Sequence, residues 1–369
     1  MIFKKILNLN FLLIFVILIL IIIGTAALYS AGEGSFSPWA EKHIIRFGVL
    51  FFLMIIIALI DIKFIFKYSY PLFFLCLILL FSVEIIGTFG KGAERWIRIF
   101  GISVQPSEII KVAIILALAK YFHNLRFDTI GKIYHIIIPA FFILVPFVLV
   151  LLQPDLGTAI SIFLLGVMTL FIAGIRIWKF VLGVIISFGS FPFFWDLIKP
   201  YQQKRFLSFL NPELDPLGQG YQLIQSKIAL GSGGLTGKGF LEGTQSYLEY
   251  LPEKQTDFIF TLIGEEFGFI GTMFILLLFG LLISICFYTS VRTYHIFGRI
   301  ICLGVACNIF IYVILNMAMV TGLMPVVGIP LPLISYGGTA MLSIMVSFGL
   351  LLNVGIHYNV KKLINDVRN

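Results

Sequence analysis

Charged residues are scarce in this sequence: Asp, Glu, Lys and Arg together make up 12% of its 369 residues. Soluble domains carry about 25% charged residues, because polar side chains must cover their cores. The scarcity therefore argues against a soluble protein. A hydrophobic content of 60% and a mean hydropathy of +1.05 argue equally against a disordered chain.

Cysteine and histidine are also rare, with four and five residues. The cysteines lie inside or at the edges of apolar stretches and lack metal-ligand spacing, so we expect buried thiols rather than disulfides or a zinc site. The histidines are dispersed, and no triad spacing supports His-based catalysis.

Long apolar runs dominate what remains. A membrane-spanning helix needs about 20 apolar residues, and a spanning backbone must satisfy its own hydrogen bonds. The sequence predicts an all-α integral membrane protein, a single polytopic domain over residues 1–369. We expect ten transmembrane helices, at about 11–29, 44–60, 71–87, 107–122, 136–152, 157–174, 180–197, 258–285, 299–321 and 336–357.

The distribution of basic residues predicts the orientation. One set of loops and termini holds fourteen Lys and Arg against three acids, whereas the short loops of the other side hold five. By the positive-inside rule both termini are cytoplasmic, in the cytoplasmic (inner) membrane. The scattered cations of this +8 chain favour anionic membrane lipids as partners and argue against nucleic acid.

One long loop stands out, at residues 198–257 between the seventh and eighth helices. It is predicted to be extracytoplasmic and holds most of the polar chemistry. Loops of this length are usually functional. Chemistry, if present, is therefore expected outside the membrane.

Asp257 lies where this loop becomes an apolar helix. A half-desolvated carboxylate there has a raised pKa suited to a general base. The alternative is a helix N-cap, and both roles can coexist. Glu265 and Glu266 follow within the helix, where they need a cavity or a partner. A functional role and a structural ion pair or hydrogen bond are equally open for them.

The segment 91–99 alternates charge with Trp and Ile, as interfacial anchors do. Trp96 is expected to anchor it, and Arg95 and Arg98 either assist or meet an anionic lipid head. Next, Pro106 marks a helix start. Glu108 and Lys111 share a face of that helix, either as a structural bridge or as the lining of a polar cavity.

Three further segments favour structural roles. Asp155 is expected to cap the sixth helix. The glycine-rich stretch 231–239 lacks the spacing of a phosphate loop and is better interpreted as a flexible turn, although its N–H groups remain available to an anion. The segment 324–338 has too many prolines and glycines for a regular helix and is predicted to be a re-entrant plug.

Several motifs together resemble the SEDS family (shape, elongation, division and sporulation proteins). They are Tyr201-Gln202-Gln203-Lys204-Arg205, Phe209-Leu210-Asn211-Pro212-Glu213, Gln225-Ser226-Lys227, Thr256-Asp257-Phe258-Ile259-Phe260 and Pro330-Leu331-Pro332-Leu333-Ile334-Ser335-Tyr336-Gly337-Gly338. They run in order between residues 95 and 338, and Lys227 and residues 243–246 resemble elongation members more than division members.

The resemblance implies a peptidoglycan glycosyltransferase that polymerises lipid II on the outer face during elongation. It implies a class B penicillin-binding protein and other elongation-complex proteins as partners. The essential aspartate of the family falls on Asp257, its interfacial Trp on Trp96, and its Glu/Lys pair on Glu108 and Lys111. Ser335 and Tyr336 belong to a matching motif and are expected to support the site, as are Glu265 and Glu266.

The chemistry fits this substrate class. Cations for the pyrophosphate of lipid II are expected from Arg95, Arg98, Lys111, Lys204 and Arg205. Asp257 acts as the base, or it holds a divalent cation (Mg²⁺ or Mn²⁺) against the pyrophosphate. The sequence leaves these roles open, and it leaves a lipid II flippase and a non-catalytic scaffold as alternative functions.

Overall fold

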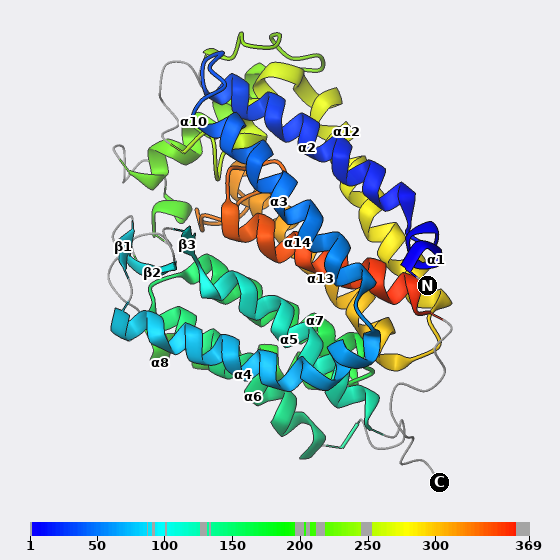
Figure 1. Ribbon diagram of the computed structural model, residues 1–369. Helices are drawn as coiled ribbons and strands as arrows, with labels where there is room; N and C mark the ends of the chain where they lie inside the picture. The colour runs from blue at the N-terminus through cyan, green and yellow to red at the C-terminus, as the bar shows by residue number, and fades with distance from the viewer. Residues whose placement is uncertain are drawn as a thin grey trace.

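The computed structural model describes residues 2–86, 88–90, 93–99, 102–125, 131–132, 134–195, 203, 207–211, 218–244 and 253–358. Long helices dominate this part of the chain and run along a common direction (Figure 1). Their bounds are α1 (Ile2–Leu7), α2 (Phe11–Ala31), α3 (Trp39–Leu59), α4 (Ile62–Ile86), α5 (Pro106–His123), α6 (Tyr134–Leu152), α7 (Leu156–Ile172), α8 (Ile177–Trp195), α10 (Gln219–Ser232), α12 (Ile259–Arg292), α13 (Ile296–Thr321) and α14 (Gly338–Ile356).

Each of the ten predicted transmembrane segments falls on one long helix. Seven of these helices are long and apolar enough to cross a membrane, namely α2, α3, α4, α6, α12, α13 and α14. Of the others, α7 is apolar but has 17 residues, and α5 carries three charged side chains. The chain is therefore a multi-pass membrane protein.

Helix α4 begins nine residues before its predicted start, because Pro71 lies inside it instead of opening it. Proline cannot donate to the carbonyl four residues earlier, here that of Lys67. Lys120 of α5 replaces the missing donor, with its Nζ 2.9 Å from Lys67 O. A basic residue of a neighbouring helix thus donates to the backbone carbonyl that the proline leaves without its helical donor.

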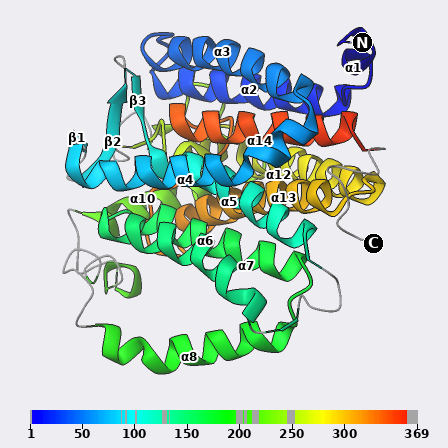
Figure 2. The same cartoon turned by 60° about the horizontal axis from the view of Figure 1, so that its bottom comes forward.

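Helix α13 is central: it packs against α5, α7, α12 and α14, and it is among the most buried of the spans. Helix α8 lies apart from the others in Figure 2, and several of its described apolar side chains, including Trp178 and Ile185, are exposed as lipid-facing residues are. All four cysteines are buried free thiols, as predicted.

Two elements were not expected. Three short antiparallel strands precede α5, in the order β1 (Thr88–Gly90), β2 (Ala93–Ile99) and β3 (Ile102–Val104). The segment predicted as an interfacial strip therefore forms the central strand of a small sheet, because its alternating side chains suit a strand. The predicted outer loop 198–257 contains the helix α10.

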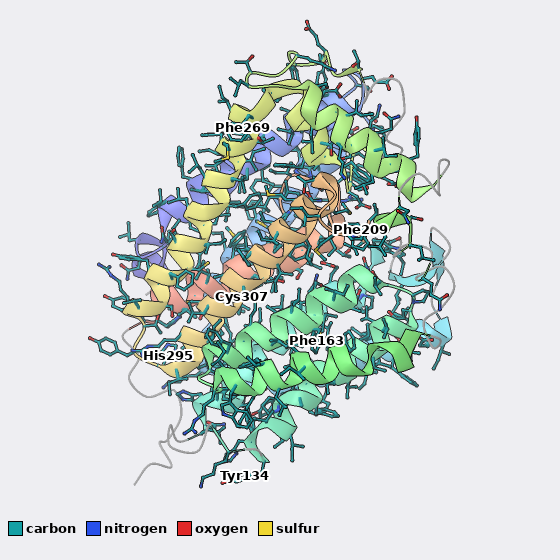
Figure 3. All side chains as sticks on the ribbon, turned by 180° about the vertical axis from the view of Figure 1, so that it is seen from behind. Tyr134, Phe163, Phe209, Phe269, His295 and Cys307 are labelled. Atoms are coloured by element: carbon teal, nitrogen blue, oxygen red, sulfur yellow. The ribbon has the colours of Figure 1, made fainter. Side chains whose placement is uncertain are left out.

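Helix α1 and the end of α14 lie at one end of the bundle, and the strands lie at the other (Figure 1). His295 and Tyr134 mark the end with α1, and Phe209 the end with the strands (Figure 3). The predicted cytoplasmic loops thus gather at one end, which we call the terminal end. The opposite end, with the strands and α10, we call the strand end.

Candidate functional site

The turn at residues 253–258 places Asp257 at the start of α12. The N–H groups of Thr256 and Phe258 donate to Glu253 O, over 3.1 and 3.3 Å. The N-cap residue of α12 is Phe258, and no side chain makes a cap hydrogen bond there. Asp257 therefore stands one residue outside the position that the N-cap hypothesis assigned to it.

Two other elements hold the backbone of this turn. From the segment before α14, Ser335 Oγ donates to Thr256 O over 2.6 Å, and Tyr336 N donates to Gln255 O over 2.9 Å. From α13, Asn316 Nδ2 donates to Asp257 O over 2.9 Å. The predicted supporting residues Ser335 and Tyr336 therefore do meet the turn that carries Asp257.

Asp257 is half-buried, as predicted, and its carboxylate lies beside Gly328. A Cβ at Gly328 would stand 3.3 Å from Asp257 Oδ2 and would need a φ of +73°. Both the close approach and the left-handed backbone favour glycine. The segment 324–338 is thus more than a plug, since its backbone passes close to this carboxylate.

Glu108 and Lys111 form the predicted pair on α5, with Lys111 Nζ 2.8 Å from Glu108 Oε1. Both are buried, with 5% and 1% of their surface exposed. Tyr312 of α13 completes the cluster: its hydroxyl donates to Glu108 Oε2, and Lys111 Nζ lies 4.1 Å from its ring centroid. Charges this deeply buried persist because each has partners.

Helix α13 connects this cluster to the turn of Asp257. Tyr312 and Asn316 are four residues apart and so lie on one face, one helical turn from each other. Tyr312 binds Glu108, while Asn316 binds the backbone of Asp257 and also Ile329 O, at 2.7 Å. We did not select either residue from the sequence, although two polar side chains at this spacing in an apolar helix were a usable signal.

Gln105 and Asp155 extend the polar contacts at the start of α5. Asp155 caps α7 as predicted, accepting from Thr158 N over 3.3 Å. Its Oδ2 also accepts from Gln105 Nε2 over 2.9 Å. The carboxylate therefore ties the N-terminus of α7 to that of α5, in agreement with the structural role expected for it.

Arg46 of α3 is a cation that the sequence interpretation missed. Its guanidinium carbon lies 4.5 Å from the centroid of the Tyr336 ring. It is half-buried, and Tyr336 in turn binds the turn before Asp257. Arg46 sits within an apolar helix far from every matched motif, so its place near the site depends on tertiary structure.

Glu265 and Glu266 form a different cluster, further along α12. Glu265 Oε1 accepts from Lys238 Nζ over 2.8 Å and from Thr244 Oγ1 over 3.2 Å. Glu266 Oε1 accepts from Ser30 Oγ of α2. Both acids are buried, and these bonds match the structural alternative considered for them.

The glycine-rich loop 233–239 closes against the same part of α12. This helix is interrupted at Gly268, whose φ of 64° and ψ of −160° are not helical. The loop supplies acceptors to the interrupted turn, with Phe269 N donating to Gly234 O over 2.9 Å, and it donates from Lys238 N to Glu265 O over 3.0 Å. Since these N–H groups meet carbonyls, the loop is a packed connection, not a flexible turn or an anion site.

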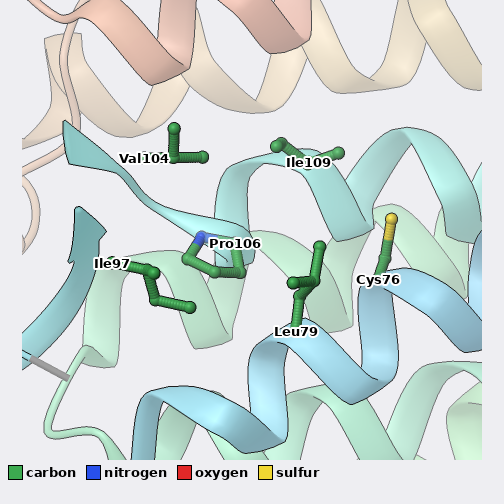
Figure 4. A pocket seen from close by; sticks show the side chains of 6 residues that line it. All are labelled: Cys76, Leu79, Ile97, Val104, Pro106 and Ile109. Atoms are coloured by element: carbon green, nitrogen blue, oxygen red, sulfur yellow. The ribbon is translucent and has the colours of Figure 1, made fainter. Parts of the chain in front are cut away.

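The remaining predicted site residues are described in part. Trp96 lies in β2 opposite Thr88 and is half-buried. The side chains of Arg95 and Arg98, and all of Lys204 and Arg205, lie outside the described residues. Behind the start of α5, a cavity of about 20 Å³ is lined by apolar side chains, among them Ile97 and Pro106 (Figure 4). It is far too small for a substrate.

Comparison with known proteins matches most of the chain to one protein family. The profile of the FtsW/RodA/SpoVE family, described as cell cycle protein, matches residues 4–360. The peptidoglycan glycosyltransferase MrdB of Escherichia coli K12 is 38% identical over 347 residues, covering 94% of this chain and 93% of that protein. Stage V sporulation protein E of Bacillus subtilis is 37% identical over 356 residues, covering 94% and 96%.

Solved structures agree with the fold. A chain from a study of structural coordination of polymerization and crosslinking by a peptidoglycan synthase complex matches with a TM-score of 0.82 and 30% identity, covering 95% of this chain and 99% of that one. The rod shape determining protein RodA of Thermus thermophilus matches with a TM-score of 0.71 and 24% identity, covering 95% and 98%.

Proposed function

Because the chain belongs to the FtsW/RodA/SpoVE family, the SEDS family that its motifs resemble, we propose that it is a peptidoglycan glycosyltransferase. It polymerises lipid II into β-1,4-linked glycan strands during cell elongation. The observation that carries this proposal is the placement of Asp257: a half-buried carboxylate whose backbone two other elements hold in place.

The reaction requires a base and charge stabilisation. Forming a β-1,4 link from an α-linked pyrophosphate donor is a displacement with inversion. A base removes the proton of the acceptor 4-hydroxyl, and cations stabilise the leaving pyrophosphate. Asp257 is the base in this proposal, and glycine at position 328 keeps a Cβ from standing 3.3 Å from its Oδ2.

The basic residues have different proposed roles in the site. Arg46 is half-buried against Tyr336 and supplies positive charge near the turn of Asp257. Lys111 is already neutralised by Glu108, so its part is to shape the wall of the site with Tyr312. Arg95, Arg98, Lys204 and Arg205 remain the proposed further contacts to the pyrophosphate.

A divalent cation is compatible with Asp257. Mg²⁺ typically uses one or two carboxylates together with phosphate oxygens. The described part of the chain has no group of three His, Cys, Asp or Glu side chains that could hold a metal ion. A cation at Asp257 would therefore take its other ligands from pyrophosphate and water. A pH–rate profile with and without chelator separates the roles, since activity unaffected by chelation leaves Asp257 as the base.

The proposed location is the cytoplasmic membrane, with the strand end and Asp257 facing outward. The excess of Lys and Arg at the terminal end supports this orientation. The proposed partner is a class B penicillin-binding protein. The similarity to a chain studied as part of a peptidoglycan synthase complex supports this choice.

One assay tests the function. Purified protein with its penicillin-binding partner receives labelled lipid II, and glycan chains are sought. We expect chains from the wild type and none from Asp257→Ala with an unchanged melting temperature. Absence of chains from the folded wild-type complex would contradict the proposal. Lipid II transport into vesicles without polymerisation would then identify a flippase, and loss of both activities a scaffold.

A further inference from the structure

A second cavity lies at the terminal end, between the connection from α1 to α2 and the ends of α12 and α14. Its volume is about 270 Å³, and it is far from Asp257 along every helix that lines it. Asn8 and Asn10 line it from the connection between α1 and α2, Tyr288 and Arg292 from α12, and Leu351 from α14. The catalytic proposal makes no use of this cavity.

The polar lining residues of the cavity suit an anion. Arg292 contributes its guanidinium, and none of the lining residues is acidic. The guanidinium carbon lies 4.4 Å from the centroid of the Tyr288 ring, which orients it. Among the residues that the structure describes, Arg292 forms no ion pair. Its planar fork of donors matches the oxygens of a phosphate.

Other lining residues suit hydrocarbon. Leu13, Ile285 and Leu352 are apolar, and each is at least 90% buried. Outside the cavity, Phe15 of α2 and Phe287 of α12 are 59% and 53% exposed on lipid-facing surfaces. A ligand that fits both the polar and the apolar lining residues is therefore amphiphilic, with an anionic head and an apolar tail.

The position of the cavity along the helices indicates where that anionic head lies relative to the membrane. Asn10 is the N-cap of α2, and Arg292 is the last residue of α12. The cavity thus lies where two membrane-spanning helices end, which is the level of lipid headgroups. The terminal end is also the basic end of the molecule, to which anionic lipids are attracted.

We propose that this cavity binds the phosphate headgroup of an anionic glycerophospholipid. Arg292 binds the phosphate, and the amide groups of Asn8 and Asn10 bind the headgroup oxygens. The volume lies near the lower end of small-molecule sites, roughly 300–1,000 Å³. It accommodates the head and glycerol, while the acyl chains follow the exposed surfaces of α2 and α12.

Native mass spectrometry of the full chain in detergent tests this proposal. We expect retained phosphatidylglycerol on the wild type and about tenfold less on Arg292→Ala, because one charge-assisted contact is lost. The matched control is Arg176→Ala, an exposed arginine of the loop between α7 and α8 that does not line the cavity. Equal retention by the two variants would overturn the proposal.

A second variant blocks the space without removing charge. A Cβ at Gly355, which lines the cavity, meets only Thr289, at 3.8 Å. Gly355→Phe therefore fills the cavity from α14 and is expected to lower phosphatidylglycerol retention as Arg292→Ala does. Undiminished retention by folded Gly355→Phe would also overturn the proposal.

Two further ligands, tested in the same experiment, identify what the cavity binds. Phosphatidylcholine, which carries the same phosphate but no net charge, is expected to be retained less than phosphatidylglycerol. Soluble glycerol phosphate is expected not to displace the lipid. Displacement at equal concentration would assign the cavity to a soluble phosphate and contradict the lipid assignment.

Discussion

Asp257 lies just before α12 and Glu265 in the second turn of that helix, and the fold holds the two acids in different ways. Asp257 is half-buried, and Asn316 binds its backbone carbonyl. Glu265 is fully buried, and Lys238 and Thr244 bind its carboxylate directly. The backbone is fixed in the first case, and the side-chain charge is satisfied in the second.

The difference fits the proposed division between a reactive carboxylate, Asp257, and a structural one, Glu265. A base must reach substrate, and the hydrogen bonds to the backbone of this turn position the partly exposed carboxylate of Asp257 for that role. A buried carboxylate bound by an ammonium group and a hydroxyl instead secures the loop that donates them. Glu108, which binds Lys111 and Tyr312, resembles Glu265 in this respect.

The largest expected effect is on catalysis. Asp257→Asn keeps the shape of the side chain and removes the base, so the rate of lipid II polymerisation should fall about 10²- to 10⁴-fold. The melting temperature should stay unchanged. The control is Asp61→Asn at the terminal end, an exposed aspartate that accepts from Lys63 N. A polymerisation rate within a few-fold of the wild type would contradict the role of Asp257.

The next effect is on stability. Lys111→Met leaves Glu108 buried without its cation, which should lower the free energy of unfolding by about 3–5 kcal/mol. Thermal unfolding in detergent measures the loss. The double variant Glu108→Gln/Lys111→Met should lose less than the sum of the single variants. An additive result would mean that the two residues act independently.

A smaller effect concerns the space beside the base. Gly328→Ala places a methyl group 3.3 Å from Asp257 Oδ2, so the polymerisation rate should fall about tenfold to hundredfold. Gly174→Ala is the matched control: its φ is +100°, yet nothing lies within 4 Å of the added Cβ. If both variants lose the same activity, backbone strain and not crowding of the carboxylate is responsible.

The smallest expected effect is that of removing the charge of Glu265, the structural counterpart of Asp257 in this comparison. Glu265→Gln removes the charge that holds Lys238, and the free energy of unfolding should fall by about 1–3 kcal/mol. The polymerisation rate per folded molecule should change little. Lys238→Met should reproduce this behaviour, because it breaks the same pair from the other side. A large loss of rate with unchanged stability would place Glu265 in the catalytic group.

Local rules predicted much of this arrangement. Pro106 opens α5, Asp155 caps α7, and Glu108 pairs with Lys111, each within four residues along the chain. Helical geometry alone fixes such contacts. The apolar runs likewise placed all ten long helices, since a spanning backbone has no alternative to regular hydrogen bonding.

Contacts between distant segments were not predictable in the same way. Arg46 meets Tyr336 across 290 residues, and the loop 233–239 pairs with the interruption of α12 at Gly268. Nothing in the local sequence specifies these partners. The strands at 88–104 were missed because alternation of charged and apolar residues suits both a small sheet and an interfacial anchor.

The central claim is that Asp257 is reactive and Glu265 structural, and one measurement compares them directly. Wild type, Asp257→Asn and Glu265→Gln, each in complex with the proposed penicillin-binding partner, receive labelled lipid II at equal folded concentration. The account predicts glycan chains from the wild type and Glu265→Gln and a rate at least about 100-fold lower from Asp257→Asn. Chains from Asp257→Asn at the rate of Glu265→Gln would contradict it.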